Sequence, residues 1–232
     1  MGVSYASTAV ARTGAERLTL IRRTYSVVLG GVIVTMLGVA TALTQPQIMQ
    51  AVLAHPFITL ILMFAPLLMA QRTARVFPAN VGFTFLFTFL EGLWLAPFLA
   101  LAERGQPGII VQAGVLTGAA FATLTTFAFV SRRDFSAWGG FFITGLVVVL
   151  LASLLNVFVL HNSAADLWLA GAIVLVFSGL LVFDTWRLRN VYGPDDYIPA
   201  AINIYLDLLN LFIARPAEPA PAGSGPAERE SA

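Results

Sequence analysis

The chain of 232 residues is 58% hydrophobic and only 11% charged. Because soluble domains carry about 25% charged residues, this composition excludes a soluble globular protein and indicates an integral membrane protein. The net charge of +1, without a basic cluster beyond short pairs, gives no sign of a nucleic-acid partner. The absence of cysteine excludes disulfides, thiol catalysis and cysteine-ligated metals.

Seven apolar stretches follow one another, most of them near the length of about 20 residues that crosses a bilayer. They cover residues 24–44, 56–71, 79–101, 109–130, 137–160, 167–187 and 197–213. We therefore expect an all-α protein with a cytoplasmic segment at 1–23 and a single seven-helix transmembrane domain at 24–213. Residues 214–232 are rich in Pro, Ala, Gly and Ser, which predicts a disordered tail.

Arginine marks alternate connections between these stretches. The opposite connections carry just Arg104, and the arginine-bearing ends hold Arg12, Arg17, Arg22, Arg23, Arg72, Arg75, Arg132, Arg133, Arg187 and Arg189. By the positive-inside rule, the N-terminus is expected in the cytoplasm, and we expect a multi-pass protein of the plasma (inner) membrane. An odd number of spans then places the C-terminus outside.

The fourth stretch carries a row of small residues, Gly114, Gly118 and Ala122. Small residues spaced four apart let helices approach closely, so we interpret this row as a packing surface.

The seventh stretch has a single polar seam. Asp196 can cap the helix and Pro199 falls in its first turn. Beyond them, Asn203, Asp207 and Asn210 follow helical spacing, so they lie on one face. A helix that is apolar on its other sides is expected at the centre of the bundle, with this seam turned toward a polar cavity.

Two carboxylates interrupt the apolar stretches, Asp184 in LLVFDTWRL and Asp207 in NIYLDLLNLF. An ionisable residue inside a membrane is a functional-site hypothesis by default. Both lie about equally far from the turn that joins their helices, so they are expected to face each other and to share a proton. The alternative is structural: Asp184 neutralises Arg187, and Asp207 bonds Asn203.

The segments FVSRRDFSAWGGFFITGL, GLLVFDTWRL and DYIPAAINIYLDLLNLF resemble bacterial members of the Bax inhibitor-1 (transmembrane Bax-inhibitor-motif) family, from about residue 18 to residue 213. The resemblance implies six helices around a central seventh and a pH-sensitive cation leak, chiefly of Ca²⁺. In bacterial members the leak is attributed to an aspartate pair, which falls on Asp184 and Asp207. The family also implies that an arginine after the second helix pairs with the first of these aspartates, which points to Arg72 or, second, Arg75.

One departure from the family concerns the second helix. Bacterial channel members carry an acid there, whereas HPFITLILMFAPLLMA has none. Glu91, in FLFTFLEGLWLAPF of the third helix, is the candidate substitute in the ion pathway. The alternative is a protonated acid bonded to a neighbouring helix.

These observations predict a pH-sensitive calcium and cation leak channel with the Asp184–Asp207 pair as its sensor. The two aspartates, with Asn203, Asn210 and water, offer a transient Ca²⁺ site, because Ca²⁺ takes six to eight oxygens. We expect no tightly bound cofactor, and the lipid bilayer, calcium and protons as partners. No enzyme motif is present, and the aspartates lack the glycine surroundings of intramembrane aspartyl proteases. The alternative is a regulatory partner of a membrane protease or another membrane complex.

Overall fold

The computed structural model describes residues 14–214, which form eight α-helices and one π-helical turn, with no strand in that range. The elements are α1 (Gly14–Thr44), α2 (Pro46–Ala54), α3 (Pro56–Arg72), α4 (Ala79–Gly105), α5 (Ile109–Val130), α6 (Trp138–Leu155), η2 (Asn156–Leu160), α7 (Ser163–Asn190) and α8 (Tyr197–Ile213). All seven predicted stretches are helical. The first helix begins at Gly14 rather than at residue 24, and α2 occupies a segment expected to be a loop. The predicted tail beyond Ala214 lies outside the described residues.

Five helices are long and apolar enough to cross a membrane: α1, α4, α5, α6 with η2, and α7. The helix α3 reaches the required length only together with α2, and the two are bent by 104° relative to each other. The helix α8 is apolar but has 17 residues, or about 25 Å, near the lower limit for a span. The all-α membrane fold is therefore confirmed, whereas the count of seven crossings stays a prediction.

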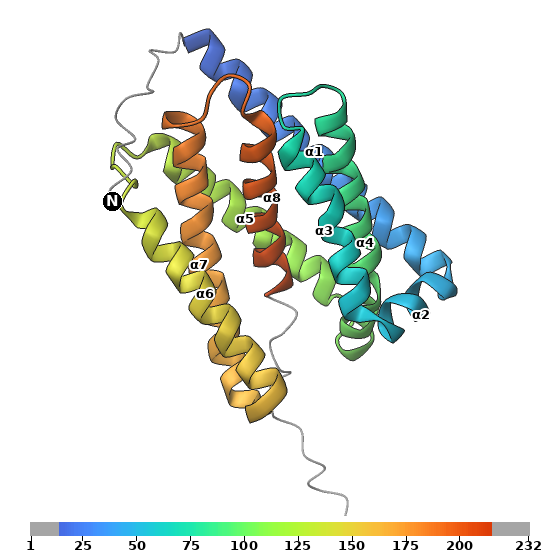
Figure 1. The fold of residues 1–232 in the computed structure, drawn as a ribbon. Coiled ribbons are helices and arrows are strands. Elements are labelled where there is room, and N and C mark those ends of the chain that lie inside the picture. Colours follow the sequence, from blue (N-terminus) through green and yellow to red (C-terminus); the bar gives the residue numbers. More distant parts are fainter. Residues whose placement is uncertain (1–13, 215–232) are drawn as a thin grey trace, which may run out of the picture.

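The helix α8 occupies the middle of the bundle, as Figure 1 shows. It contacts α1, α3, α4, α5 and α7, and residues on several of its faces are buried. The helix α6 packs chiefly against α7 and leaves most of its surface exposed. The predicted central position of α8 is thus confirmed, with α6 attached to the bundle through α7.

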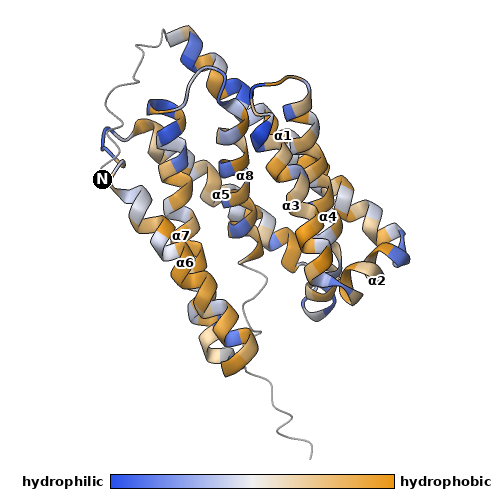
Figure 2. Cartoon of the chain, in the orientation of Figure 1, coloured by the Kyte–Doolittle hydropathy of each residue, from blue (hydrophilic) through white to orange (hydrophobic). Residues whose placement is uncertain are grey.

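The arginine-bearing connections meet at one end of the bundle, where Figure 2 shows hydrophilic residues. Arg75 Nη2 donates to Asp196 Oδ1 at 3.0 Å, which joins the α3–α4 and α7–α8 connections. Arg189 Nη1 donates to the carbonyl oxygens of Phe129 and Ser131 at 2.7 and 3.0 Å, at the end of α5. The shared end agrees with the arginine pattern of the sequence.

The start of α8 differs from the prediction in one respect. Pro199 lies in the first turn as expected, but the Asp196 side chain does not cap the helix. Its Oδ1 accepts from Arg75, and its Oδ2 accepts from the Gly193 amide at 2.8 Å. The ion pair and the turn use the carboxylate that was predicted to cap α8.

Close helix packing occurs at a different place from the predicted row of small residues. A Cβ on Gly38 would clash with the carbonyl oxygen of Phe89, and one on Gly92 with that of Thr35. The backbones of α1 and α4 therefore touch. A Cβ on Gly114 or Gly118 of α5 would meet no atom within 4 Å, so the prediction that this row packs against a helix is wrong. Gly114 and Gly118 border an apolar cavity instead.

Candidate functional site

Asp184 of α7 and Asp207 of α8 face each other inside the bundle. Their exposed fractions are 7% and 4%, and their carboxyl groups lie within hydrogen-bonding reach. Carboxylate oxygens only accept hydrogen bonds, so a bond between the two groups requires a proton on one of them. Asp207 Oδ2 is otherwise buried without a donor among residues 14–214. The structure thus brings the two predicted residues together.

Arg187 supplies a cation to this pair. It lies three residues after Asp184, and its Nη1 donates to Asp184 Oδ1 at 2.9 Å. The guanidinium also lies over the rings of Tyr192 and Phe183, 4.7 and 5.6 Å from their centroids. This ion pair was foreseen as the structural alternative, and it coexists with the aspartate contact. One positive charge therefore serves two carboxyl groups.

Asn203 and Tyr192 extend the polar contact toward the arginine-bearing end. Asn203 Nδ2 donates to the Tyr192 hydroxyl at 3.0 Å, and Asn203 lies near Asp184 rather than bonded to Asp207 as the structural alternative expected. Burial raises the pKa of Tyr192, which follows α7 in the turn, to about 12. Tyr192 therefore stays neutral, and Asn203 links α8 to the connection that follows α7.

The rest of the predicted seam contributes less. Asn210 donates through Nδ2 to the Leu206 carbonyl of its own helix at 2.8 Å. No group of three His, Cys, Asp or Glu side chains suited to a metal occurs among residues 14–214. A Ca²⁺ ion bound here would be coordinated by two carboxylates, and its remaining ligands would be amide and water oxygens.

The two arginines suggested as latch partners are not beside Asp184 in this conformation. Arg72 is the last residue of α3 and is exposed, and the ion pairs among residues 14–214 do not include it. Arg75 pairs with Asp196 in the next connection. The position of a cation beside Asp184 is taken by Arg187.

Glu91 lies in a second polar cluster, on another side of α8. Its exposed fraction is 5%, and its carboxyl group lies near the Tyr205 hydroxyl, while its Oε2 atom is buried without a hydrogen-bond partner among residues 14–214. The Tyr205 hydroxyl shares a 2.6 Å hydrogen bond with Thr35 Oγ1. The cluster therefore places Glu91 of α4 near α8 and α1, whereas the alternative of a protonated acid bonded to a neighbouring helix stays a prediction.

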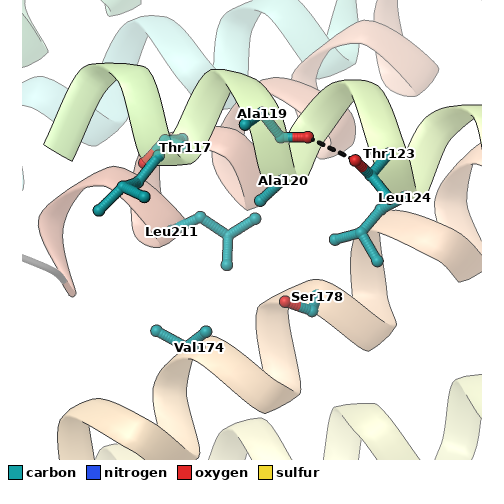
Figure 3. Close-up of a pocket in the computed structure, with 9 residues that line it drawn as sticks. Thr117, Ala119, Ala120, Thr123, Leu124, Val174, Ser178 and Leu211 are labelled. Atoms are coloured by element: carbon teal, nitrogen blue, oxygen red, sulfur yellow. Dashed lines mark hydrogen bonds between the residues drawn. The ribbon is translucent and has the colours of Figure 1, made fainter. Parts of the chain in front are cut away.

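An apolar cavity of about 370 Å³ lies between α5, α7 and the end of α8 (Figure 3). Its polar groups are hydroxyls, and Thr123 Oγ1 donates to the Ala119 carbonyl of its own helix at 2.8 Å. Ser178 lies six residues before Asp184, about 9 Å along α7, and its side chain lines the cavity beside Val174. No charged residue lines this space. The region beyond the aspartate pair therefore offers an ion little polar lining.

Two tyrosines of the site were not singled out from the sequence. Each lies close in the sequence to a residue that was singled out: Tyr192 precedes Asp196 in VYGPDD, and Tyr205 precedes Asp207 in NIYLDLL. Tyr205 precedes Asp207 by two residues, or about 200° around a helix, so it had to face different neighbours. That spacing was the available signal for a second cluster.

Comparisons with known proteins agree with this architecture. Residues 17–214 match the family described as inhibitor of apoptosis-promoting Bax1. The chain is 34% identical to Bax inhibitor 1 of Schizosaccharomyces pombe over 204 residues, covering 85% of this chain and 74% of the relative. It is 31% identical to the Golgi anti-apoptotic protein of vaccinia virus over 213 residues, with 90% and 88% covered. An uncharacterized membrane protein of Vibrio cholerae is 40% identical over 137 residues, with 58% and 60% covered.

Proposed function

Because the chain belongs to the Bax inhibitor family of membrane proteins, we propose that it is a pH-sensitive leak channel for calcium and other cations. The observation that carries this proposal is the contact between Asp184 and Asp207, which are buried in neighbouring helices; in the proposal the two carboxyl groups share a proton. A proton on that contact makes the α7–α8 interface responsive to pH.

The shared proton acts as a latch. With the proton bound, the pair carries one negative charge, which Arg187 balances, and the hydrogen bond holds α7 and α8 together. When rising pH removes the proton, two anions in a low-dielectric site repel each other. The helices then separate, or Asp184 turns toward an exposed arginine at the end of α3, for which Arg72 is the candidate. Either movement opens a polar path beside α8.

Calcium is the proposed permeant ion because the exposed seam would present only oxygen ligands. Asp184 and Asp207 supply the charge, and Asn203 and Asn210 add amide oxygens. A site with two carboxylates and no further acid holds Ca²⁺ weakly, which suits passage rather than storage. Protons also compete with Ca²⁺ for the same carboxylate oxygens. The dependence of flux on pH can therefore be bell-shaped, with a rise as protons leave and a fall where Ca²⁺ is bound too long. The apolar cavity beyond the pair supports a closed state in the present conformation.

The proposed setting is the plasma or inner membrane of a cell, with the N-terminus in the cytoplasm. This orientation rests on the arginines that gather at one end of the bundle. In this proposal the protein conducts cations and binds protons, and it is not proposed to be an enzyme.

The test is Ca²⁺ flux into liposomes that contain only the purified protein, measured over a range of pH. The proposal expects flux that depends on pH, and a flattened response in Asp184→Asn and in Asp207→Asn. Asp195→Asn is the matched control, because Asp195 is an exposed acid in the connection between the same helices. It should retain the wild-type response.

One result would reject the channel, and another would reject the aspartate pair as its sensor. The first is no flux from protein that is folded and inserted, which would leave a regulatory partner of a membrane complex as the alternative. The second is flux whose pH dependence is unchanged in both aspartate variants, which would return the pair to a structural role.

A further inference from the structure

A pocket of about 760 Å³ lies between α1, the start of α4 and the α7–α8 connection, at the hydrophilic end of the bundle (Figure 2). Three arginines line it: Arg22 and Arg23 of α1, and Arg75 of the α3–α4 connection. Asp195 of the α7–α8 connection is the acid in its lining. The volume is in the range of pockets that hold small molecules.

The pocket carries a surplus of positive charge. The ion pairs among residues 14–214 do not include Arg22 or Arg23, whereas Arg75 is paired with Asp196 at 3.0 Å. Asp195 offsets one of the two arginines that lack an ion pair, so one net positive charge remains for a ligand. A phosphodiester carries one negative charge, and the planar guanidinium group matches phosphate oxygens with two parallel N–H donors.

The wall of the pocket beside Arg23 is held in place by a buried amide. Asn80 is 1% exposed, and its Nδ2 donates to the Ala74 carbonyl oxygen at 2.8 Å and to the Tyr197 hydroxyl at 3.0 Å. The Arg23 guanidinium lies over the Tyr197 ring, 5.8 Å from its centroid. Because the Tyr197 hydroxyl accepts from Asn80, its own proton is available to a ligand. A cation and a hydroxyl donor are therefore positioned on one side of the pocket before a ligand binds.

The remaining lining is largely apolar. Val27 and Val81 line the pocket, and Val27 lies one turn after Arg23 on α1, about 6 Å farther into the bundle. Phe77 also lines the pocket and is 76% exposed. The lining thus changes from cationic to apolar toward the middle of the membrane, as a phospholipid changes from phosphate to acyl chain.

From this arrangement we propose that the pocket binds an anionic phospholipid of the leaflet at the arginine-bearing end. Arg22 and Arg23 bind the phosphate, and the Tyr197 hydroxyl donates to one of its oxygens. The acyl chains lie along Val27 and Val81. Basic pockets between membrane helices on the cytoplasmic side bind lipid head groups of this kind. The site is separate from the aspartate pair and does not depend on ion conduction.

The test is thermal unfolding of the whole protein in an uncharged detergent with short-chain phospholipids added. Dioctanoyl phosphatidylglycerol should raise the melting temperature, because a ligand that binds only the folded state stabilises it. Phosphatidylcholine with the same chains should raise it much less, since its head group carries a positive charge of its own. Inorganic phosphate at the same concentration should also raise it much less, because it lacks the acyl chains. Equal stabilisation by phosphatidylcholine or by inorganic phosphate would overturn the assignment to an anionic phospholipid.

Paired arginine variants locate the site. Arg22→Gln combined with Arg23→Gln should weaken the apparent affinity for phosphatidylglycerol about 30-fold. Both side chains are exposed and outside the ion pairs of residues 14–214, so the variant should fold. Arg132→Gln combined with Arg133→Gln is the matched control, because these exposed neighbours do not line the pocket. Equal losses in the two double variants, or no loss in the first, would reject the pocket as the site.

A change of charge in the opposite direction tests the charge balance. Asp195→Asn removes the acid that lines the pocket, so it should raise the affinity for phosphatidylglycerol. A purely structural role of the arginines would not produce this gain. Unchanged or weaker binding in Asp195→Asn would contradict the proposal.

Discussion

Arg187 and Asp184 lie three residues apart on α7 and form a hydrogen-bonded ion pair of 2.9 Å. Arg187 is partly exposed, at 31% of its side chain, whereas the Asp184 side chain is only 10% exposed. The guanidinium therefore closes the site toward the arginine-bearing end and balances the charge that the aspartate pair retains. Any other arginine that reaches Asp184 must first displace it.

Replacing these arginines should separate their roles. Arg187→Ala removes the cation from the pair, so its proton is held more firmly and the pH response of Ca²⁺ flux should move to higher pH. Arg72→Ala should change the response at the high-pH side, where Asp184 is free to turn. Flux into liposomes across pH is the measurement.

Arg75→Ala is the control for both variants, since Arg75 pairs with Asp196 at the surface and an exposed pair contributes little. If the effects of all three variants are equal and negligible, the arginines serve as anchors of topology and none takes part in the latch.

Tyr192→Phe should affect stability without affecting the pH response. The change deletes the hydroxyl that accepts from Asn203, which costs about 1 kcal/mol in the free energy of unfolding. Burial raises the pKa of Tyr192 from 10.0 to about 12, so its contribution is complete below pH 10 and declines as the pH rises toward 12. Thermal unfolding in detergent and flux at several pH values test both parts. A shifted flux response at neutral pH would show that Tyr192 belongs to the sensor.

Helix positions and the aspartate contact could be predicted from the sequence, because apolar length and the shared turn determine them. Hydrophobicity sets the stretches, and the equal distance of Asp184 and Asp207 from the connection sets their depth. The partners of other polar groups could not be predicted in this way. Asp196 was expected to cap α8 but pairs with Arg75, a choice that depends on where two separate connections meet.

The small residues show the same limit. Gly114 and Gly118 have the spacing of a packing motif, yet α5 turns them toward a cavity. Gly38 and Gly92 belong to different helices and form no motif in the sequence. Their contact arises only once α1 and α4 cross, so only the fold reveals it.

Gly92→Leu should destabilise the protein strongly. Its Cβ would meet the Thr35 carbonyl, and overpacking of this kind typically costs about 1–3 kcal/mol. Gly118→Leu introduces the same side chain into open space and should change the free energy of unfolding by no more than about 0.5 kcal/mol. Thermal unfolding of the two variants in detergent compares them. Equal losses would contradict the close contact of α1 and α4.

The orientation in the membrane can be tested by reporter fusions. The arginine pattern predicts that residues 1–20 and the SRRDFS connection are cytoplasmic, and that the tail after Arg215 lies on the other side. A reporter fused after Gly225 should be inaccessible from the cytoplasm, and one inserted between Arg133 and Asp134 should be accessible. A cytoplasmic Gly225 fusion would mean that α8, with its 17 residues, or another helix does not cross the bilayer.

The aspartate pair should behave as one unit when both members are changed. If the two carboxyl groups share one proton, as proposed, Asp184→Asn or Asp207→Asn alone removes the titrating contact, and the double variant should add little further loss of pH dependence. In the proposal the proton-bearing contact holds α7 and α8 together only in the folded state, so this part of the stability is present at low pH and is lost as the pH rises and the proton leaves. The melting temperature should therefore fall with rising pH more steeply in the wild type than in either single variant or the double variant. Thermal unfolding from acidic to alkaline pH measures this, with Asp195→Asn as the control that keeps the wild-type slope. Additive changes in slope from the two single variants would mean that the aspartates titrate independently and that no proton is shared.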